Sequence, residues 1–126
     1  MAWEIEFHPD FDPEYDEMDE AVQDELLARL KLLEVSGPQL GRPHVDTLKG
    51  SGHANIKELR FYAADGVWRF AVAFDPRRRA IVLCGGDKSG SSEKKFYRDL
   101  IRKADYRFTS HVAQLKRRKD KEGKKS

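Results

Sequence analysis

The sequence predicts an α+β domain in which an antiparallel sheet packs against N-terminal helices and a C-terminal helix. Three observations support this fold class. Residues 56–88 read as three short strands joined by two tight turns, and apolar residues recur at helical spacing both before residue 34 and after residue 95. A chain of 126 residues is large enough to bury one hydrophobic core, so we expect a single domain.

The N-terminal elements begin with a predicted strand. Residues 3–7 alternate between apolar side chains and glutamates, which is the period of a half-buried strand. Asp12-Pro13 then favours a helix start, with aspartate as the N-cap and proline at the first helical position. A break near Asp19 would divide this helix in two, and Gly37-Pro38 ends it. Its apolar stripe comprises Tyr15, Met18, Val22, Leu26, Leu30 and Leu33.

Residues 36–55 are rich in glycine, proline, serine and histidine and predict a long loop. We expect Leu40, Val45 and Leu48 to pin this loop to the core. Long loops in compact domains often carry function, and His53 lies where this one enters the sheet.

The first hairpin of the central segment determines which residues share a face of the sheet. Asp65-Gly66 is a strong hairpin signal, and with these two residues in the turn Arg60 lies opposite Ala71 and Tyr62 opposite Arg69. Alternate residues along a strand share a face, so Glu58 joins the arginines. The other face is apolar and contains Leu59, Phe61, Trp68, Phe70, Val72 and Phe74.

The second hairpin turns through Pro76–Arg79. If Asp75 pairs with Ala80, then Arg69 lies opposite Gly86, and Lys88 follows on the same face. The same register adds two further side chains to the arginine face, Val82 and Cys84.

Three cations, Arg60, Arg69 and Lys88, therefore gather on one face beside small residues. Alanines and glycines leave room for a backbone or a phosphate to approach closely, which favours an anion site. The alternative is an ordinary solvated strand face, where arginine and lysine are common.

The C-terminal helix is predicted to begin after Ser92, its cap, and to run to Leu115. Its apolar stripe comprises Phe96, Leu100, Ala104, Phe108 and Leu115. Residues 116–126 contain no apolar side chain and are predicted to be disordered. The domain would then span residues 1–115, followed by a basic tail that suits either solubility or nucleic-acid binding.

Composition excludes several classes of protein. No apolar run is long enough for a transmembrane helix, and the N-terminus lacks the features of a signal peptide. The single cysteine, Cys84, excludes an intramolecular disulfide and a cysteine-rich metal site, so we expect a cytoplasmic protein. The four histidines lack metal-ligand spacing. Charge is uneven: residues 1–34 hold twelve acidic and two basic residues, whereas the rest of the chain holds ten acidic and 22 basic ones.

The order of these pieces resembles the RelE/ParE toxin superfamily, and most closely its HigB-type, phage-derived toxin-like members. The resemblance spans about residues 2–115. It rests on the order and spacing of five pieces: Glu58-Leu59-Arg60, Asp65-Gly66-Val67-Trp68-Arg69, Phe74-Asp75 with Ala80-Ile81-Val82-Leu83, Gly86-Asp87-Lys88-Ser89-Gly90, and the helix from Lys94-Lys95-Phe96-Tyr97 to Ala104-Asp105.

The resemblance implies a RelE-like fold and the toxin of a type II toxin–antitoxin pair. RelE- and HigB-like members cut mRNA on the ribosome without a metal or other cofactor. The implied partners are a cognate antitoxin of helix-turn-helix type, mRNA and the ribosome, with operator DNA contacted only through the antitoxin and no membrane. Two alternatives stay open: a ParE-like gyrase inhibitor without nuclease activity, and a cleavage-inactive member that retains antitoxin binding.

Such cleavage requires charge stabilisation on the scissile phosphate and a route for two protons. Arg60 and Arg69 fit as phosphate clamps, because guanidinium binds phosphate bidentately, and Lys88 fits as a further electrostatic stabiliser. His53 and Tyr97 are the candidates for acid and base. Glu58 could act as a base or neutralise Arg60, and we favour the second role. Further RNA-binding candidates are Lys57, Lys94 and Lys95, although Lys57 alternates to the other face.

Overall fold

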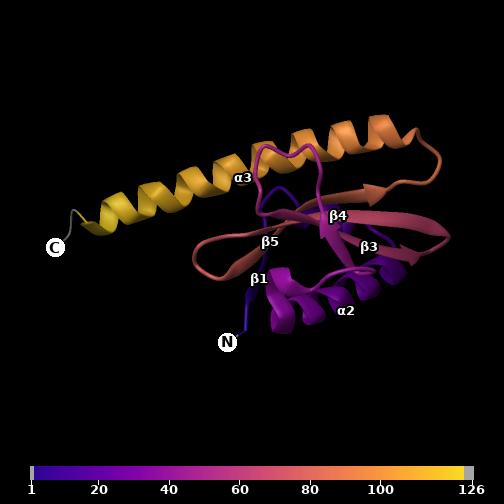
Figure 1. The fold of residues 1–126 in the computed structure, drawn as a ribbon, viewed down its shortest axis with the longest axis horizontal. Coiled ribbons are helices and arrows are strands. Elements are labelled where there is room, and N and C mark those ends of the chain that lie inside the picture. The colour runs from indigo at the N-terminus through magenta and orange to yellow at the C-terminus, as the bar shows by residue number, and fades with distance from the viewer. Residues whose placement is uncertain (1, 124–126) are drawn as a thin grey trace.

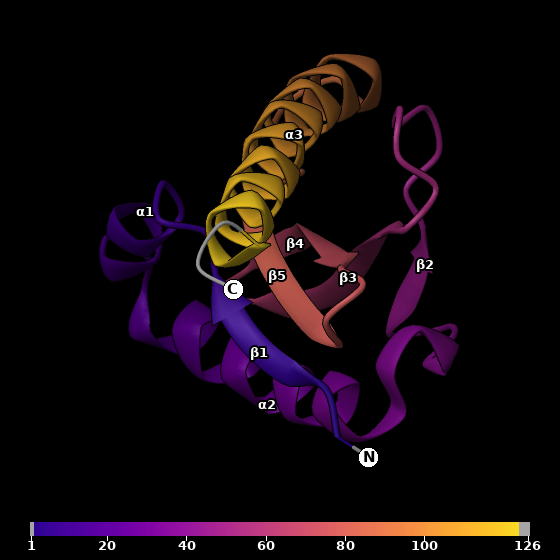
Figure 2. The same ribbon diagram turned by 90° about the vertical axis from the view of Figure 1, so that its left-hand side faces the viewer.

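The computed structural model describes residues 2–123, with side chains described for 2–118. A five-stranded sheet in the order β1-β5-β4-β3-β2 forms its centre. Helix α2 covers one face of this sheet and helix α3 covers the other (Figures 1 and 2). The strands are β1 (Glu4–Phe7), β2 (Val45–Thr47), β3 (Ile56–Ala63), β4 (Gly66–Phe74) and β5 (Arg79–Asp87). The helices are α1 (Asp12–Asp16), α2 (Glu20–Ser36), the short 3-10 helix η1 (Gly37–Gln39) and α3 (Glu93–Gly123).

The predicted N-terminal strand and the predicted break in the helix are both present. β1 pairs with β5 in parallel, so the sheet is antiparallel in three of its four pairings. Asp19 is the N-cap of α2, and Phe11, one residue before the predicted cap, occupies that position in α1. Gly37 ends α2 with a φ of +60°, and a Cβ there would lie 2.1 Å from the Trp3 indole nitrogen. Only glycine fits this junction.

The first hairpin has a different register from the predicted one. Ala64 and Asp65 occupy the turn with φ of 48° and 59°, and Gly66 is already paired with Ala63. Arg60 therefore lies opposite Arg69 and not opposite Ala71. A Cβ on Gly66 would lie 2.8 Å from side-chain atoms of both Trp68 and Asp87, so these close contacts require glycine at this position. The partner changes by two positions, so each residue keeps its predicted face.

The second hairpin contains a β-bulge that the sequence did not reveal. Arg69 pairs with Gly86 as predicted, but a register shift between Ala71 and Val72 makes Phe74, not Asp75, the partner of Ala80. Val82 consequently packs on the α2 side and not on the arginine face. Asp75 instead closes the turn, because its Oδ1 accepts hydrogen bonds from the backbone N–H groups of Arg77 and Arg79.

The hydrophobic core lies on both faces of the sheet. One cluster joins α2 to Leu59, Phe61 and Phe70, and the second joins α3 to Ala71, Ala73, Ile81 and Cys84. The arginine face is therefore buried beneath α3 over part of its length. Helix α3 also continues beyond Leu115 to Gly123, so residues 116–123 of the predicted disordered tail are helical, and residues 124–126 lie outside the described part of the chain. Among the described residues, no helix is long and apolar enough to cross a membrane.

Candidate functional site

A cluster of polar side chains lies on the arginine face where α3 begins. Glu58 on β3 is its centre: Oε1 lies 3.3 Å from Nε of Arg60 and 3.9 Å from Nε of Arg69. The two arginines are cross-strand neighbours, so the hairpin register itself brings them together. One carboxylate between two guanidiniums leaves the group with a positive charge.

Arg69 is the least satisfied member of this cluster. Its side chain is 5% exposed, and NH1 donates to the backbone carbonyl of Trp68 over 3.0 Å. Among the buried polar side-chain atoms that the structure describes, only Nε of Arg69 has no hydrogen-bond partner. Leaving a buried donor unpaired costs about 1–3 kcal/mol, so an acceptor supplied by a ligand would remove an existing penalty.

Tyr97 connects the cluster to Lys88. Burial raises the pKa of the Tyr97 hydroxyl, a hydrogen bond with Arg69 lowers it, and one with Glu58 raises it. Because the net shift of this pKa is upward, the hydroxyl is protonated at neutral pH and can donate. The ammonium of Lys88 lies 5.9 Å from the centre of the Tyr97 ring and 3.2 Å from Oε1 of Glu93. The structure thus brings Arg60, Arg69, Lys88 and Tyr97 together.

A cavity of about 640 Å³ opens beside this cluster at the edge of the sheet. Most of the residues that line this cavity were not identified from the sequence. Arg29 comes from α2 and residues 42–44 precede β2, so no sequence pattern indicated that they would lie beside β3. No acidic side chain is among the described residues that line it, which are Arg29, Arg42, Pro43, His44, Arg60, Phe61, Tyr62 and Arg69.

His53 lies away from the cluster. Its Nε2 is 3.1 Å from Oγ1 of Thr109, and its ring packs edge-on against Phe108 at 4.8 Å. Thr109 follows Tyr97 by twelve residues along α3, which is roughly 18 Å at the helical rise. The role predicted for His53 therefore has no support from its contacts, which pack the loop onto α3.

The remaining predicted RNA-binding lysines are dispersed. Lys57 lies on the α2 side of the sheet, as its position in β3 indicated, and its Nζ is 3.4 Å from Oγ1 of Thr47. Lys94 and Lys95 are exposed in the first turn of α3, where Ser92 caps the helix by accepting from the Lys95 N–H.

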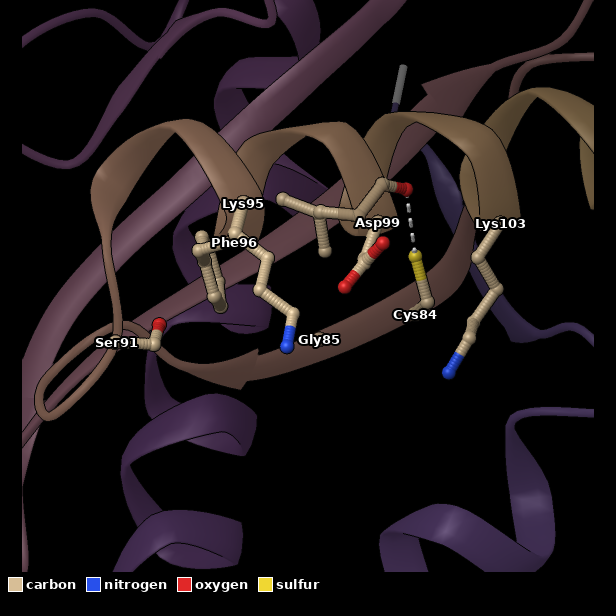
Figure 3. A pocket seen from close by; sticks show the side chains of 8 residues that line it. Cys84, Gly85, Ser91, Lys95, Phe96, Asp99 and Lys103 are labelled. Carbon is tan, nitrogen blue, oxygen red and sulfur yellow. Dashed lines mark hydrogen bonds between the residues drawn. The ribbon is translucent and has the colours of Figure 1, made fainter.

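Lys95 borders a second, smaller hollow of about 190 Å³ between α3 and the end of β5 (Figure 3). Cys84 lies at its floor and donates from Sγ to the Leu100 carbonyl over 3.6 Å. Burial raises the pKa of the Cys84 thiol to about 12, so this cysteine packs as a small apolar residue and does not act as a nucleophile. Within the described residues, no group of three or more His, Cys, Asp or Glu side chains could hold a metal ion.

The fold is shared with a solved toxin structure. The chain superposes on the free state of a mutant of the Escherichia coli toxin RelE with a TM-score of 0.60, over 82% of this chain and 97% of that one. The two are 14% identical, so this likeness concerns the fold alone. It defines the class: an α+β protein with a RelE-like fold and a cationic cluster at the start of its last helix.

Sequence comparison then places the chain in a family. Residues 13–109 match the model of the phage-derived Gp49-like proteins, and the chain belongs to that family. It is 41% identical over 112 residues to "Putative toxin HigB2" and 46% identical over 84 residues to "Putative toxin HigB3", both of Mycobacterium tuberculosis. The aligned regions cover 84% and 67% of this chain, and 55% and 71% of the respective relatives. The predicted resemblance to HigB-type members of the RelE superfamily is confirmed.

Proposed function

We propose that this chain is the toxin of a type II toxin–antitoxin system and that it cleaves mRNA on the ribosome. The observation that carries the proposal is Arg69, a buried guanidinium with an unpaired Nε on the wall of an open cationic cavity. A phosphodiester oxygen is the kind of acceptor that such a group lacks. The names of the curated relatives and the RelE-like fold support the same proposal.

The proposed reaction is an in-line transfer at phosphorus. The ribose 2′-oxygen loses its proton to solvent and bonds to the adjacent phosphorus, while the bond from phosphorus to the 5′-oxygen breaks and that oxygen gains a proton. The products are a 2′,3′-cyclic phosphate and a 5′-hydroxyl. Arg60 and Arg69 would stabilise charge on the phosphoryl oxygens, and Lys88 would add to the positive field.

Tyr97 is the best-placed proton donor in this scheme. Its hydroxyl interacts with Arg69, the residue assigned to the phosphate, and its raised pKa keeps the proton available at neutral pH. Glu58 lies between the two arginines, where its carboxylate orients both guanidiniums. We assign it that positioning role.

Induced expression without the antitoxin tests this function. We expect growth and translation to stop, primer extension to reveal new mRNA 5′ ends, and co-expression of the antitoxin to restore growth. Arg60→Ala and Arg69→Ala should each reduce cleavage by about 10²–10³-fold, by analogy with the loss of one oxyanion donor. Arg69→Lys should rescue poorly, because an ammonium cannot bind phosphate bidentately.

The control is Arg102→Ala, which removes an exposed arginine of α3 that pairs with Asp99 outside the cavity. Circular dichroism of each variant separates loss of function from loss of fold. Growth arrest with inhibited gyrase and intact mRNA would instead identify the ParE-like alternative. Folded Arg69→Ala protein that cuts mRNA at the normal rate would refute the site.

A further inference from the structure

Six of the eight residues that line the cationic cavity have no part in the proposed cleavage site. Besides Arg60 and Arg69, the polar lining residues are Arg29, Arg42, His44 and Tyr62. These four residues come from α2, the segment before β2, and β3. They converge on one cavity of about 640 Å³, a volume within the range of small-ligand sites, which makes this part of the cavity a candidate for a second contact with RNA.

The two ring nitrogens of His44 have different roles in this cavity. NH1 of Arg29 lies 2.6 Å from Nδ1 of His44, and because arginine is only a donor, Nδ1 is the acceptor. Nε2 is then the ring nitrogen that can donate. Glu25 holds Arg29 from the other side, with Oε2 3.1 Å from its Nε. The imidazole is thus fixed in a form that suits a phosphate oxygen.

Arg42 is connected to the cleavage site through one carboxylate. Oδ2 of Asp46 lies 2.9 Å from NH2 of Arg42 and 3.9 Å from NH1 of Arg60. A hydrogen bond from the Thr47 N–H and another from Arg42 lower the pKa of Asp46, so it stays ionised and keeps the two guanidiniums side by side. The Arg42 side chain is 73% exposed and can also meet a second anion.

Tyr62 supplies a flat apolar surface beside these cations. It lies two residues beyond Arg60 on the same strand and therefore on the same face. The residue is 77% exposed, so its ring is open to a ligand at the cavity. Exposed aromatic rings next to basic side chains are typical platforms for unpaired bases.

We propose that Arg29, Arg42, His44 and Tyr62 form a subsite for the nucleotide that adjoins the scissile phosphate. Arg42 and Nε2 of His44 contact its phosphate, Arg29 fixes His44, and its base stacks on Tyr62. The inference rests on the proposed function and extends it: the protein would bind at least two consecutive phosphates of one RNA strand.

The test measures binding of a fluorescent, fully 2′-O-methylated RNA hexanucleotide, which lacks the attacking hydroxyl, over a series of salt concentrations. Each phosphate contact on a single strand contributes about 0.7 to the slope of log K against log salt. Arg42→Ala should therefore reduce the slope by about 0.7. Arg102→Ala is the matched control, since its side chain is 75% exposed and pairs with one aspartate as Arg42 does.

The stacking contact has its own pair of variants. Tyr62→Ala should weaken binding by roughly 5- to 150-fold with an unchanged salt slope, whereas Tyr62→Phe should bind almost normally. The subsite would be overturned if the wild-type protein did not bind the hexanucleotide. It would also be overturned if Arg42→Ala and Tyr62→Ala both bound the hexanucleotide as the wild type does. If Arg69→Ala still abolishes growth arrest in that case, the subsite fails while the proposed function stands.

Discussion

Arg69 combines burial with an incomplete set of partners, which is an expensive state for a cation. Its Nε is buried and unpaired, and its ion pair with Glu58 is long at 3.9 Å. Proteins retain such unsatisfied groups where function requires them. The penalty for the unpaired donor is present in the folded protein before any ligand binds, so an acceptor that reached Nε would remove an existing cost.

Tyr97 gives the sharpest prediction at this scale. Tyr97→Phe keeps the ring contacts with Phe96 and Lys88 but removes the hydroxyl that interacts with Arg69 and Glu58. If that hydroxyl is the proton donor, cleavage should fall by about 10²–10⁴-fold while the fold and RNA binding are retained. Cleavage rates on programmed ribosomes and thermal unfolding measure the two effects.

The exposed Tyr106 provides the control for this substitution. It lies further along α3 and is 74% exposed, so Tyr106→Phe should leave cleavage unchanged. A Tyr97→Phe protein that cuts as fast as the wild type would transfer the proton-donor role to another group.

Single positions on the sheet were predictable where only the alternation of faces mattered. Arg60, Arg69 and Glu58 could be placed together because a shift of the partner by two positions keeps every face. The cross-strand partner of Arg60 was not predictable. Ala64 adopts a positive φ in the turn, a conformation that is normally found at glycine, asparagine or aspartate. His44 escaped notice because its significance depends on Arg29, fifteen residues away on another element.

At the scale of elements, the Asp105 carboxylate of α3 anchors the loop before β3, in addition to the His53 contacts with Thr109 and Phe108. Asp105 accepts hydrogen bonds from Oγ of Ser51 at 2.5 Å and from the N–H of Gly52 at 2.8 Å. Asp105→Ala should loosen this loop, with faster hydrogen exchange at Gly52 and His53 and a local loss of about 1–3 kcal/mol.

Asp99→Ala on the same helix is the comparison, because Asp99 contacts only the exposed Arg98 and Arg102 among the described ion pairs. If His53 serves the active site in spite of its position, loosening the loop should also reduce cleavage. If it only packs on α3, cleavage should survive in Asp105→Ala. Equal exchange rates in the two variants would contradict the anchoring role.

A second element-scale contact joins α1 to α3. Arg107 donates to both carboxylate oxygens of Glu14, at 2.8 and 2.6 Å, and to the Leu83 carbonyl at 2.7 Å. The hydrogen bond from Arg107 lowers the pKa of Glu14. A lowered pKa stabilises the fold above the unfolded value of 4.5, and this contribution disappears as pH falls through the lower folded value.

Glu14→Gln should therefore destabilise the protein at neutral pH and flatten its stability profile below pH 4.5. Because Glu14 is about one-third exposed, we expect a loss of about 1–2 kcal/mol, below that of a fully buried pair. Urea unfolding at several pH values measures it, with the exposed Glu17→Gln as control. Parallel pH profiles for wild type and Glu14→Gln would contradict the assignment.

Elements with strong periodicity were predictable, and those set by tertiary contacts were not. The stripe from Val22 to Leu33 is buried as expected. β2 is only three residues long, too short to show alternation, and the β-bulge near Ala71 is a property of strand pairing and not of one strand. Residues 116–123 are helical because they continue a helix that is already formed earlier in α3. Adding residues to an existing helix is favourable enough that they need no apolar side chains.

At the scale of the molecule, acidic and basic residues are unevenly placed. Residues 1–34, with twelve acidic and two basic side chains, supply α1 and α2; α2 lies on the face opposite α3 (Figure 2), whereas Glu14 of α1 pairs with Arg107 of α3. Arg60, Arg69, Lys88 and the cationic cavity lie on the α3 side or at the sheet edge. A polyanion approaching the molecule would be directed toward that side, and more strongly at low salt.

The same uneven placement predicts how an antitoxin would neutralise this protein. A partner that blocks the site directly should place acidic side chains on Arg60, Arg69 and Lys88, so its affinity should fall as salt rises. Arg60→Ala should weaken the complex by about 1–2 kcal/mol, roughly tenfold, mainly through a faster dissociation rate. Arg102→Ala should leave both rates unchanged, because that exposed arginine lies outside the cavity. Surface plasmon resonance over a salt series measures these effects. A salt-independent complex that arrests cleavage while Arg60 remains dispensable would show that neutralisation acts at a distance from the site, through the fold and not by occupying it.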